Sequence, residues 1–343
     1  MPRFTDLEAS PETYFRSVIL FGRNVASYKF ALGRALLTLA GQGKTFVTLE
    51  ELALEYVPPL LHHLQHGGKQ GTFANSRFLS ACERYLQGEV SHEQLIQTTV
   101  QLGFTNVLDA FHTVGRDAVP TRFYADERRS RGGIALTDEL LALPETADLQ
   151  YRNLAVEIEA RWRLVETAWE LRLPSSLISV FSDAQSQELF ILDAQKRRRP
   201  LGRVRDVLNG YQKGRCFYCN TPIGVEGPEA TAEVDHVFPH VLMRRDVLKV
   251  NLDGVWNLVL SCQSCNRGAD GKFACVPATH LVERLSRRNE HLIASQHPLR
   301  ETLMAHLGAT EAARRSFLQH VERAAVAALI FRWQPSEELP STF

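Results

Sequence analysis

Four of the six cysteines fall into two Cys-x-x-Cys pairs, and this feature restricts the fold of the chain more than any other. The pairs are Cys216/Cys219 and Cys262/Cys265. Zn²⁺ prefers four tetrahedral ligands and binds thiolates readily, so the two pairs can close one structural site that leaves no position for water. A loop-rich segment of about 60 residues has too small a core to order itself, and metal binding can supply the missing free energy. The spacing predicts a structural zinc site, and taken alone it allows a module that only binds or stabilises.

Polar residues with a different chemistry lie between the two cysteine pairs and directly after the second one. Carboxylate and amide oxygens suit Mg²⁺ or Mn²⁺, and a neutral imidazole can deprotonate water near pH 7. The segment therefore combines a candidate hard-cation site with a candidate general base. The residues are Asp235-His236 with Pro239 and His240, then Asn257-Leu258, then Asn266-Arg267-Gly268.

This segment, about 60 of the 343 residues, resembles the HNH nuclease family in its zinc-bearing branch. The family pattern is Cys-x-x-Cys, Asp-His-x-x-Pro, Asn-Leu and Cys-x-x-Cys-Asn, and every part of it occurs here in that order. The resemblance implies a ββα-metal fold in which Asp235 and Asn266 bind a catalytic Mg²⁺ or Mn²⁺. It also implies that His236 is the general base and that Asn257 braces the loop carrying it.

Three further residues near the motif allow more than one interpretation. His240 can bind the cation, contact a phosphate or lie on the surface, because family members differ at this position. Arg267 and Lys272 follow Asn266 and either bind a phosphate or are solvated charges. Cleavage as the resemblance implies it yields a 5′-phosphate and a 3′-hydroxyl, with the cation stabilising the transition state.

A basic stretch precedes the motif. Residues 190–250 hold 11 Lys or Arg against 7 Asp or Glu, although the formal charge of the whole chain is zero. Affinity for nucleic acid must then come from a local patch rather than from net charge. We expect the run Lys196, Arg197, Arg198 and Arg199 to contact the DNA backbone, although such runs are often only a solvated face.

Helical periodicity dominates outside the motif, which predicts a mainly α protein with a small α+β module. We expect a helical N-terminal domain, with a short strand or loop around Thr121–Tyr124, and a helix at Leu154–Leu173 whose Trp162 and Trp169 lie in a core. His62, His63 and His66 are expected to be exposed on a helix. The expected domains are 1–145 (helical), 146–200 (linking helices and basic segment, with a strand at Phe190–Leu192), 201–275 (nuclease module, entered by a helix at Arg203–Tyr211) and 276–343 (C-terminal helices).

The function that these features favour is hydrolysis of DNA phosphodiesters by a metal-dependent endonuclease. The alternative is a zinc-containing module that binds nucleic acid without catalysis. One such site cuts one strand, so a double-strand break needs a homodimer or two encounters. The N-terminal domain then suits a sensor or a docking unit for a partner protein, as in antiviral defence or restriction. The sequence has no signal-peptide pattern and no apolar run long enough for a membrane span, so we expect a cytoplasmic protein.

Overall fold

The computed structural model divides the chain into two compact units, Ala9–Arg172 and the remainder. The first is called the N-terminal unit below and the second the C-terminal unit, and each is described by itself. None of the helices within the described ranges combines the length and apolar character needed to span a bilayer. The structure describes residues 9–22, 26–66, 69–71, 76–114, 117–144, 148–170, 180–183, 188–192, 198–203, 208–209, 212–224, 231–244, 248, 250–294 and 299–340.

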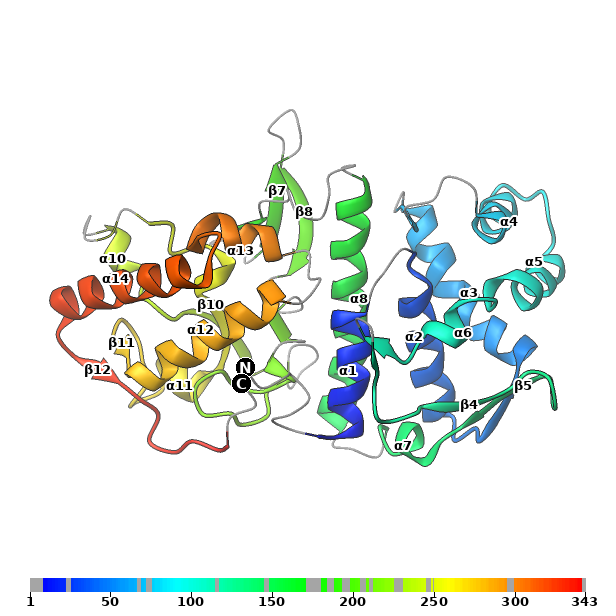
Figure 1. The fold of residues 1–343 in the computed structure, drawn as a ribbon, viewed down its shortest axis with the longest axis horizontal. Helices are drawn as coiled ribbons and strands as arrows, with labels where there is room; N and C mark the ends of the chain where they lie inside the picture. Colours follow the sequence, from blue (N-terminus) through cyan, green and yellow to red (C-terminus); the bar gives the residue numbers. More distant parts are fainter. Residues whose placement is uncertain are drawn as a thin grey trace. The chain divides into compact units, whose positions relative to one another are not determined.

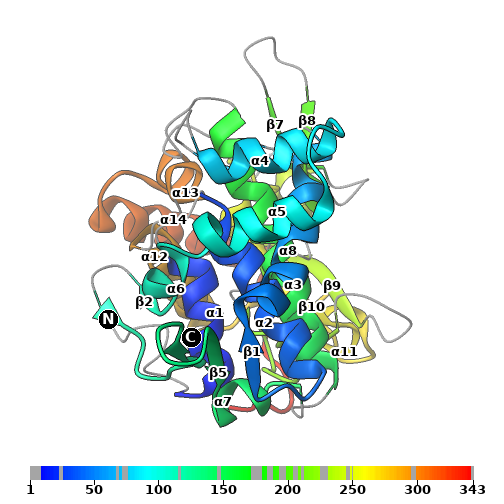
Figure 2. The ribbon, with the colours of Figure 1, turned by 90° about the vertical axis from the view of Figure 1, so that its right-hand side faces the viewer.

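Helices build most of the N-terminal unit (Figures 1 and 2). Four of them begin at a residue whose hydroxyl oxygen accepts a backbone hydrogen bond from the first turn, namely Ser10, Thr48, Ser76 and Ser91. The helices are α1 (Pro11–Phe21), α2 (Tyr28–Gly41), α3 (Leu49–Gln65), α4 (Arg77–Leu86), α5 (His92–Thr98), α6 (Val107–Ala110), α7 (Asp138–Leu141) and α8 (Asp148–Glu170), with a π-helical turn η1 (Thr99–Gly103) after α5.

A small antiparallel sheet completes this unit. Its strand order is β1 (Phe46–Thr48), β5 (Gly133–Leu136), β4 (Tyr124–Glu127), and a two-stranded ribbon pairs β2 (Thr113–Val114) with β3 (Asp117–Ala118). A Cβ on Gly133 would lie 2.1 Å from the Val47 carbonyl oxygen, so the close approach of β1 requires glycine there. A short strand or loop was expected around Thr121–Tyr124; the segment is loop as far as Phe123, and β4 begins at Tyr124.

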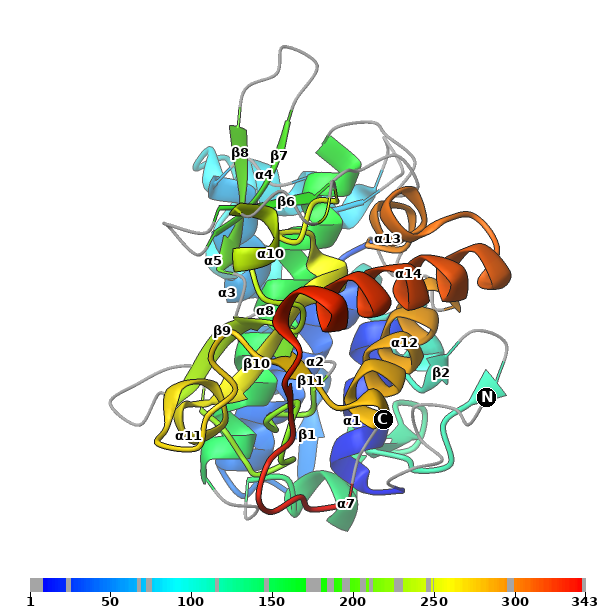
Figure 3. The same ribbon diagram turned by 90° about the vertical axis from the view of Figure 1, so that its left-hand side faces the viewer.

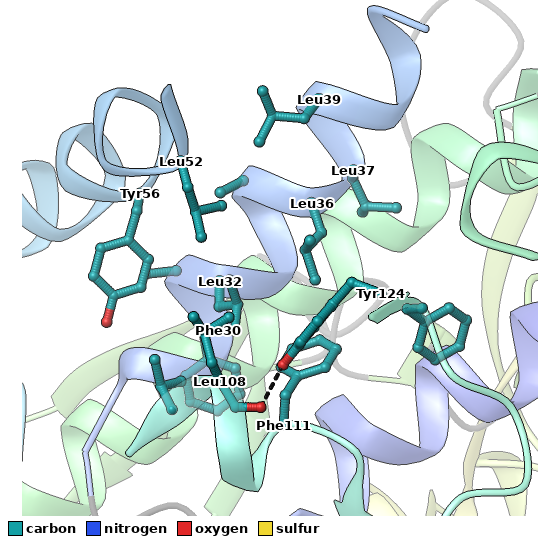
Figure 4. Packing of buried hydrophobic residues seen from close by; sticks show 14 of the residues in the cluster. Phe30, Leu32, Leu36, Leu37, Leu39, Leu52, Tyr56, Leu108, Phe111 and Tyr124 are labelled. Atoms are coloured by element: carbon teal, nitrogen blue, oxygen red, sulfur yellow. Dashed lines mark hydrogen bonds between the residues drawn. The ribbon is translucent and has the colours of Figure 1, made fainter. Parts of the chain in front are cut away.

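The core of the N-terminal unit is continuous and largely apolar. Phe30, Leu32 and Leu36 of α2 point into it, and the Tyr124 hydroxyl donates to the Leu108 carbonyl oxygen at 2.7 Å (Figure 4). The stripe of α8 is buried in the same core, with Trp162 fully covered and Trp169 packed against it, as the periodicity predicts. The sequence placed this helix in a linking segment, whereas its contacts make it part of the N-terminal unit.

The C-terminal unit contains small sheets and a group of helices (Figure 3). Strands β6 (Val180–Asp183), β7 (Glu188–Leu192) and β8 (Arg198–Arg203) form an antiparallel sheet, which confirms the strand expected at Phe190–Leu192. A helix was expected to begin at Arg203, but that residue ends β8, and most of the expected helix lies outside the described residues. The other helices are α10 (Val241–Arg244), α11 (Gln263–Arg267), α12 (Thr279–Ala294), α13 (Arg300–Leu307) and α14 (Glu311–Leu329), with a 3₁₀ turn η3 (Val255–Asn257).

Two further strand pairs position the candidate site. β9 (Ala232–His236) pairs antiparallel with β10 (Leu258–Cys262), and α11 follows β10 without an intervening loop. β11 (Val276–Pro277) pairs parallel with β12 (Arg332–Trp333), which returns the chain from α14 to the end of the motif. The described chain is thus mainly helical with small sheets, and it contains a ββα unit where the sequence predicted a small α+β module.

Candidate metal and catalytic site

The four cysteines of the two pairs meet at one point of the C-terminal unit. Their sulfur atoms all lie within 4.8 Å of one another. In the first pair, the Cys216 amide donates to the Thr221 carbonyl oxygen, and Asn220 takes the left-handed backbone conformation that asparagine tolerates. In the second pair, the Cys262 sulfur caps α11 and accepts from the Cys265 amide at 3.4 Å.

The chemistry of this thiol cluster suits zinc. Hydrogen bonds from Cys216 and the other thiols lower the pKa of Cys219 far below its ordinary value, and bonds within the same cluster raise the pKa of Cys265 far above it. Four sulfurs at this distance compete for protons, so they cannot all ionise without a cation among them. Zn²⁺ takes four thiolates in a closed tetrahedral site, and these residues supply that donor set. Within the described ranges, this is the one group of three or more His, Cys, Asp or Glu side chains close enough to hold an ion.

Helix α12 holds both the thiol cluster and the neighbouring strand. Buried Arg284 donates to the carbonyl oxygens of Phe217 and Tyr218, at 2.6 and 2.9 Å, inside the first cysteine pair. Buried Arg288 donates to the carbonyl oxygens of Trp256 and Leu258, at 2.8 and 2.9 Å, where η3 leads into β10. The C-terminal helices are therefore a structural support of the motif.

Asp235 and His236 are the last two residues of β9, and they have different surroundings. Asp235 pairs with Val259 across the sheet and His236 with Leu258. Side chains of successive strand residues point to opposite faces, so the carboxylate and the imidazole leave the strand in opposite directions.

The imidazole of His236 is anchored by a carboxylate. Its Nε2 donates to Asp253 Oδ1 at 2.8 Å, and Nε2 of His240 lies 3.5 Å from the same oxygen. The hydrogen bond from His236 lowers the pKa of Asp253, with the charge of both imidazoles adding to the effect. The His236 side chain keeps 21 % of its surface exposed, so water and substrate can reach the ring while Asp253 fixes it. The structure thus places His240 beside the candidate base.

Asn257 joins the loop after β9 to the loop before β10. Its Oδ1 accepts from the Phe238 amide at 2.8 Å, and its Nδ2 donates to the carbonyl oxygens of Phe238 and Leu252 at 3.0 and 2.9 Å. The residue is fully buried, so these bonds are shielded from water. The first of these loops follows His236 directly and the second carries Asp253, so Asn257 links the two segments that bear the His236–Asp253 pair.

Asp235 lies in a buried polar network. The Tyr218 hydroxyl donates to Asp235 Oδ2 at 2.6 Å, and Lys272 Nζ lies 3.1 Å from the same oxygen. The Lys272 side chain has no exposed surface. In this structure its ammonium faces the carboxylate of the candidate cation site rather than solvent, so it does not present itself to a phosphate.

Asn266 contacts a residue that the sequence did not single out. Its Nδ2 donates to Glu233 Oε2 at 2.7 Å, and Arg267 donates to Glu233 Oε1 at 2.8 Å through Nε. Glu233 and Asp235 are two apart on β9 and so share one face of the strand. Glu233 thus adds a third oxygen-bearing side chain to Asp235 and Asn266, the two that the sequence singled out. Arg267 stays 61 % exposed and remains accessible to a phosphate.

Sequence reasoning missed Asp253, Glu233 and Tyr218. Glu233 was detectable from strand alternation, because it stands two residues before Asp235. No local pattern links Asp253 to His236, which lies 17 residues earlier.

The basic run is described only in part. Arg198 and Arg199 are the first residues of β8, opposite Leu192 and Ile191 of β7, while Lys196 and Arg197 lie outside the described residues.

Comparisons of the chain with protein-family models, with curated proteins and with solved structures found no match.

Proposed function

We propose that the chain is a metal-dependent DNA endonuclease of the HNH type, with its active site on β9 and α11. The observation that carries the proposal is the hydrogen-bonded pair of His236 and Asp253. Asp235 precedes His236 on the opposite face of β9, so the proposal requires the phosphate to bind at the end of the strand, where both side chains can be reached. A carboxylate that fixes an accessible imidazole is an arrangement suited to general-base catalysis. The thiol cluster and Asn257 support it, because they hold the strands and loops from which these side chains project.

In the proposed reaction, His236 removes the proton from the attacking water. Its Nε2 already donates to Asp253, so Nδ1 is the atom that accepts the proton. Asp253 then stabilises the imidazolium that forms and keeps the ring oriented. As water adds to phosphorus, the bond to the 3′ oxygen breaks. That oxygen takes a proton from solvent to become the 3′-hydroxyl, and the other product is a 5′-phosphate.

Asp235 and Asn266 are the proposed ligands of a catalytic divalent cation. Asn266 donates through Nδ2 to Glu233, so Oδ1 of Asn266 is the atom that would bind a cation. When bound, Mg²⁺ or Mn²⁺ supplies positive charge that stabilises the transition state and the departing oxygen. Arg267 is the proposed phosphate contact on α11 because it remains exposed beside Asn266.

The test is nicking of supercoiled plasmid in Mg²⁺ or Mn²⁺. His236→Ala should keep zinc and fold while losing about 10²–10⁴-fold in rate, the usual contribution of a general base. Asp253→Asn should also slow cutting, because the amide cannot stabilise an imidazolium as a carboxylate does. His320→Ala is the matched control, since His320 is an exposed histidine on α14 of the same unit. Equal rates for the parent and His236→Ala would exclude this mechanism.

One contact favours the alternative, a zinc module that binds nucleic acid without cutting it. Lys272 Nζ already faces Asp235, and an ammonium at that position opposes binding of a second cation. The two functions differ in how they respond to metal. A catalytic site gives nicking that depends on Mg²⁺ or Mn²⁺ concentration and on Asp235, whereas a binding module gives DNA affinity with no nicking at any metal concentration.

A further inference from the structure

Phe273 combines an unfavourable backbone conformation with an exposed ring. Its φ of 46° lies in the left-handed region, where a bulky side chain is disfavoured. The residue is 57 % exposed, so burial of the ring does not compensate for that conformation. Residues held in such conformations tend to cluster at functional sites, where the surrounding structure enforces them.

The backbone of Phe273 is held by residues of the proposed active site. Its amide donates to the Asn266 carbonyl oxygen at 3.0 Å. Its own carbonyl oxygen accepts from Lys272 Nζ at 3.2 Å, and the Lys272 amide donates to the Cys265 carbonyl oxygen at 2.7 Å. Both sides of the residue are therefore fixed, and the ring projects from a rigid support beside Asn266.

Two more exposed apolar residues lie close by. Because β11 and β12 run parallel, the chain segments that precede them meet at the same end of the pair. Phe273 stands before β11, while Ile330 and Phe331 stand before β12, and the Val276 amide donates to the Phe331 carbonyl oxygen at 3.3 Å. Ile330 and Phe331 are 73 % and 74 % exposed, and Ile330 also has a positive φ of 63°.

We propose that Phe273 is a DNA-contacting residue of the nuclease site, and that its ring packs against the nucleobases next to the phosphate that Arg267 contacts, beside the proposed cation ligand Asn266. This inference rests on the proposed function. Aromatic side chains stack on bases of any sequence, and apolar side chains wedge between base steps. A phosphate bound beside Asn266 brings its own bases within reach of a ring on the adjoining backbone. Ile330 and Phe331 stand at the same end of the β11–β12 pair and are exposed as well.

Affinity, salt dependence and stability together test the assignment. The full chain, with its zinc retained, is titrated with a short labelled duplex in buffer without added Mg²⁺ or Mn²⁺, so that binding is measured without cutting. Phe273→Ala should weaken binding by about 5- to 150-fold, the range expected for loss of one stacked base. The slope of log affinity against log salt should stay unchanged, because the ring neutralises no phosphate. Leu54→Ala, which shortens an exposed leucine on α3 of the other unit, should leave binding unaltered.

Phe273→Gly separates a binding role from a structural one. Glycine adopts positive φ without strain, so this variant should melt at the same or a higher temperature than the parent while losing affinity to the same degree. A variant that loses stability and affinity together would show that the ring is structural. Unchanged DNA affinity in both variants would overturn the inference. If, in addition, the variants changed from dimer to monomer, the surface would be assigned to contact with a second copy of the chain.

The outcome is distinguishable from failure of the proposed function. If the parent nicks plasmid and His236→Ala does not, but Phe273→Ala binds DNA normally, only the inference about Phe273 is wrong. If the parent neither binds the duplex nor nicks plasmid, both are wrong.

Discussion

The buried histidine His63 should make the stability of the N-terminal unit depend on pH. The ring is buried and stacks on Trp162 with centroids 3.9 Å apart. Its Nδ1 lies 2.8 Å from a carboxylate oxygen of Glu166 and its Nε2 lies 3.2 Å from one of Glu159. Only the imidazolium can donate to both. Burial alone lowers the pKa of His63, but the hydrogen bonds and charges of the two carboxylates outweigh it and raise the pKa to about 9.

The sign of the effect follows from that direction. A histidine whose folded-state pKa is raised above 6.5 contributes stability that is complete below pH 6.5 and is lost as the pH rises through about 9. The difference between the two pKa values corresponds to roughly 3 kcal/mol of unfolding free energy. Burial acts against ionisation of Glu159, but its bond to His63 lowers its pKa to about 2. The carboxylate and the imidazolium share one attraction, so it is counted once.

Other groups in this unit titrate with the opposite sign. Burial lowers the pKa of Lys29 to about 8, which makes the folded state gain stability as the pH rises from 8 to 10.5. Burial, helped by the charges of Arg122 and Lys29, also lowers the pKa of His112 to about 4, which gives a gain between pH 4 and 6.5. The contributions of Lys29 and His112 are present in both the parent and His63→Gln. They cancel in the difference between the two unfolding free energies, which is therefore the quantity to measure.

Urea unfolding of both proteins, followed by tryptophan emission from pH 6 to pH 10, measures that difference. We expect the unfolding free energy of the parent minus that of His63→Gln to be roughly 3 kcal/mol larger at pH 6 than at pH 10. His92→Gln, at an exposed position on α5, is the matched control. A parent-minus-variant difference that is constant from pH 6 to pH 10 would refute the argument, because it would mean that His63 carries no charge linked to folding.

Two further predictions concern metal and DNA. Cys262→Ser should lose the zinc and lower the melting temperature, because a closed four-thiolate site does not tolerate loss of a ligand, whereas Cys275→Ser, outside the cluster, should keep the zinc and the melting temperature of the parent. Metal analysis and calorimetry measure these two quantities, and an unchanged zinc content in Cys262→Ser would disprove the assignment. Neutralising Lys196–Arg199 should flatten the slope of log DNA affinity against log salt by up to roughly 0.9 per lost phosphate contact, and an unaltered slope would show that these side chains only face water.

The sequence predicted the parts of the site that depend on spacing and alternation. The convergence of Cys216, Cys219, Cys262 and Cys265 follows from a ligand pattern that local turns can satisfy. The burial of Trp162 follows from helical periodicity. The periodicity of α8 is a short-range regularity, whereas the meeting of two cysteine pairs, with Cys219 and Cys262 43 positions apart, was predicted from the preference of Zn²⁺ for four thiolates.

Side-chain contacts between segments far apart in the sequence could not be predicted from spacing or periodicity. His63 was expected to be exposed because no acidic residue accompanies it locally, yet its partners Glu159 and Glu166 come from α8, about a hundred positions along the chain. Asp253 escaped notice for the same reason, since it reaches His236 only after the chain has turned back. A side chain's charge and neighbours in sequence do not determine its partners when tertiary packing supplies them.

The role of α12 changes the physical interpretation of the zinc site. The sequence suggested that the metal orders a segment with little core of its own. In the structure, Arg284 and Arg288 fix the first cysteine pair and the start of β10, and Trp256 packs edge-on against Phe317 of α14 at 5.2 Å. A metal bound by the four cysteines and the C-terminal helices would therefore hold the same strands. Loss of zinc should loosen the thiol end of the ββα unit first, while η3, which includes Asn257, keeps the support that Arg288 provides.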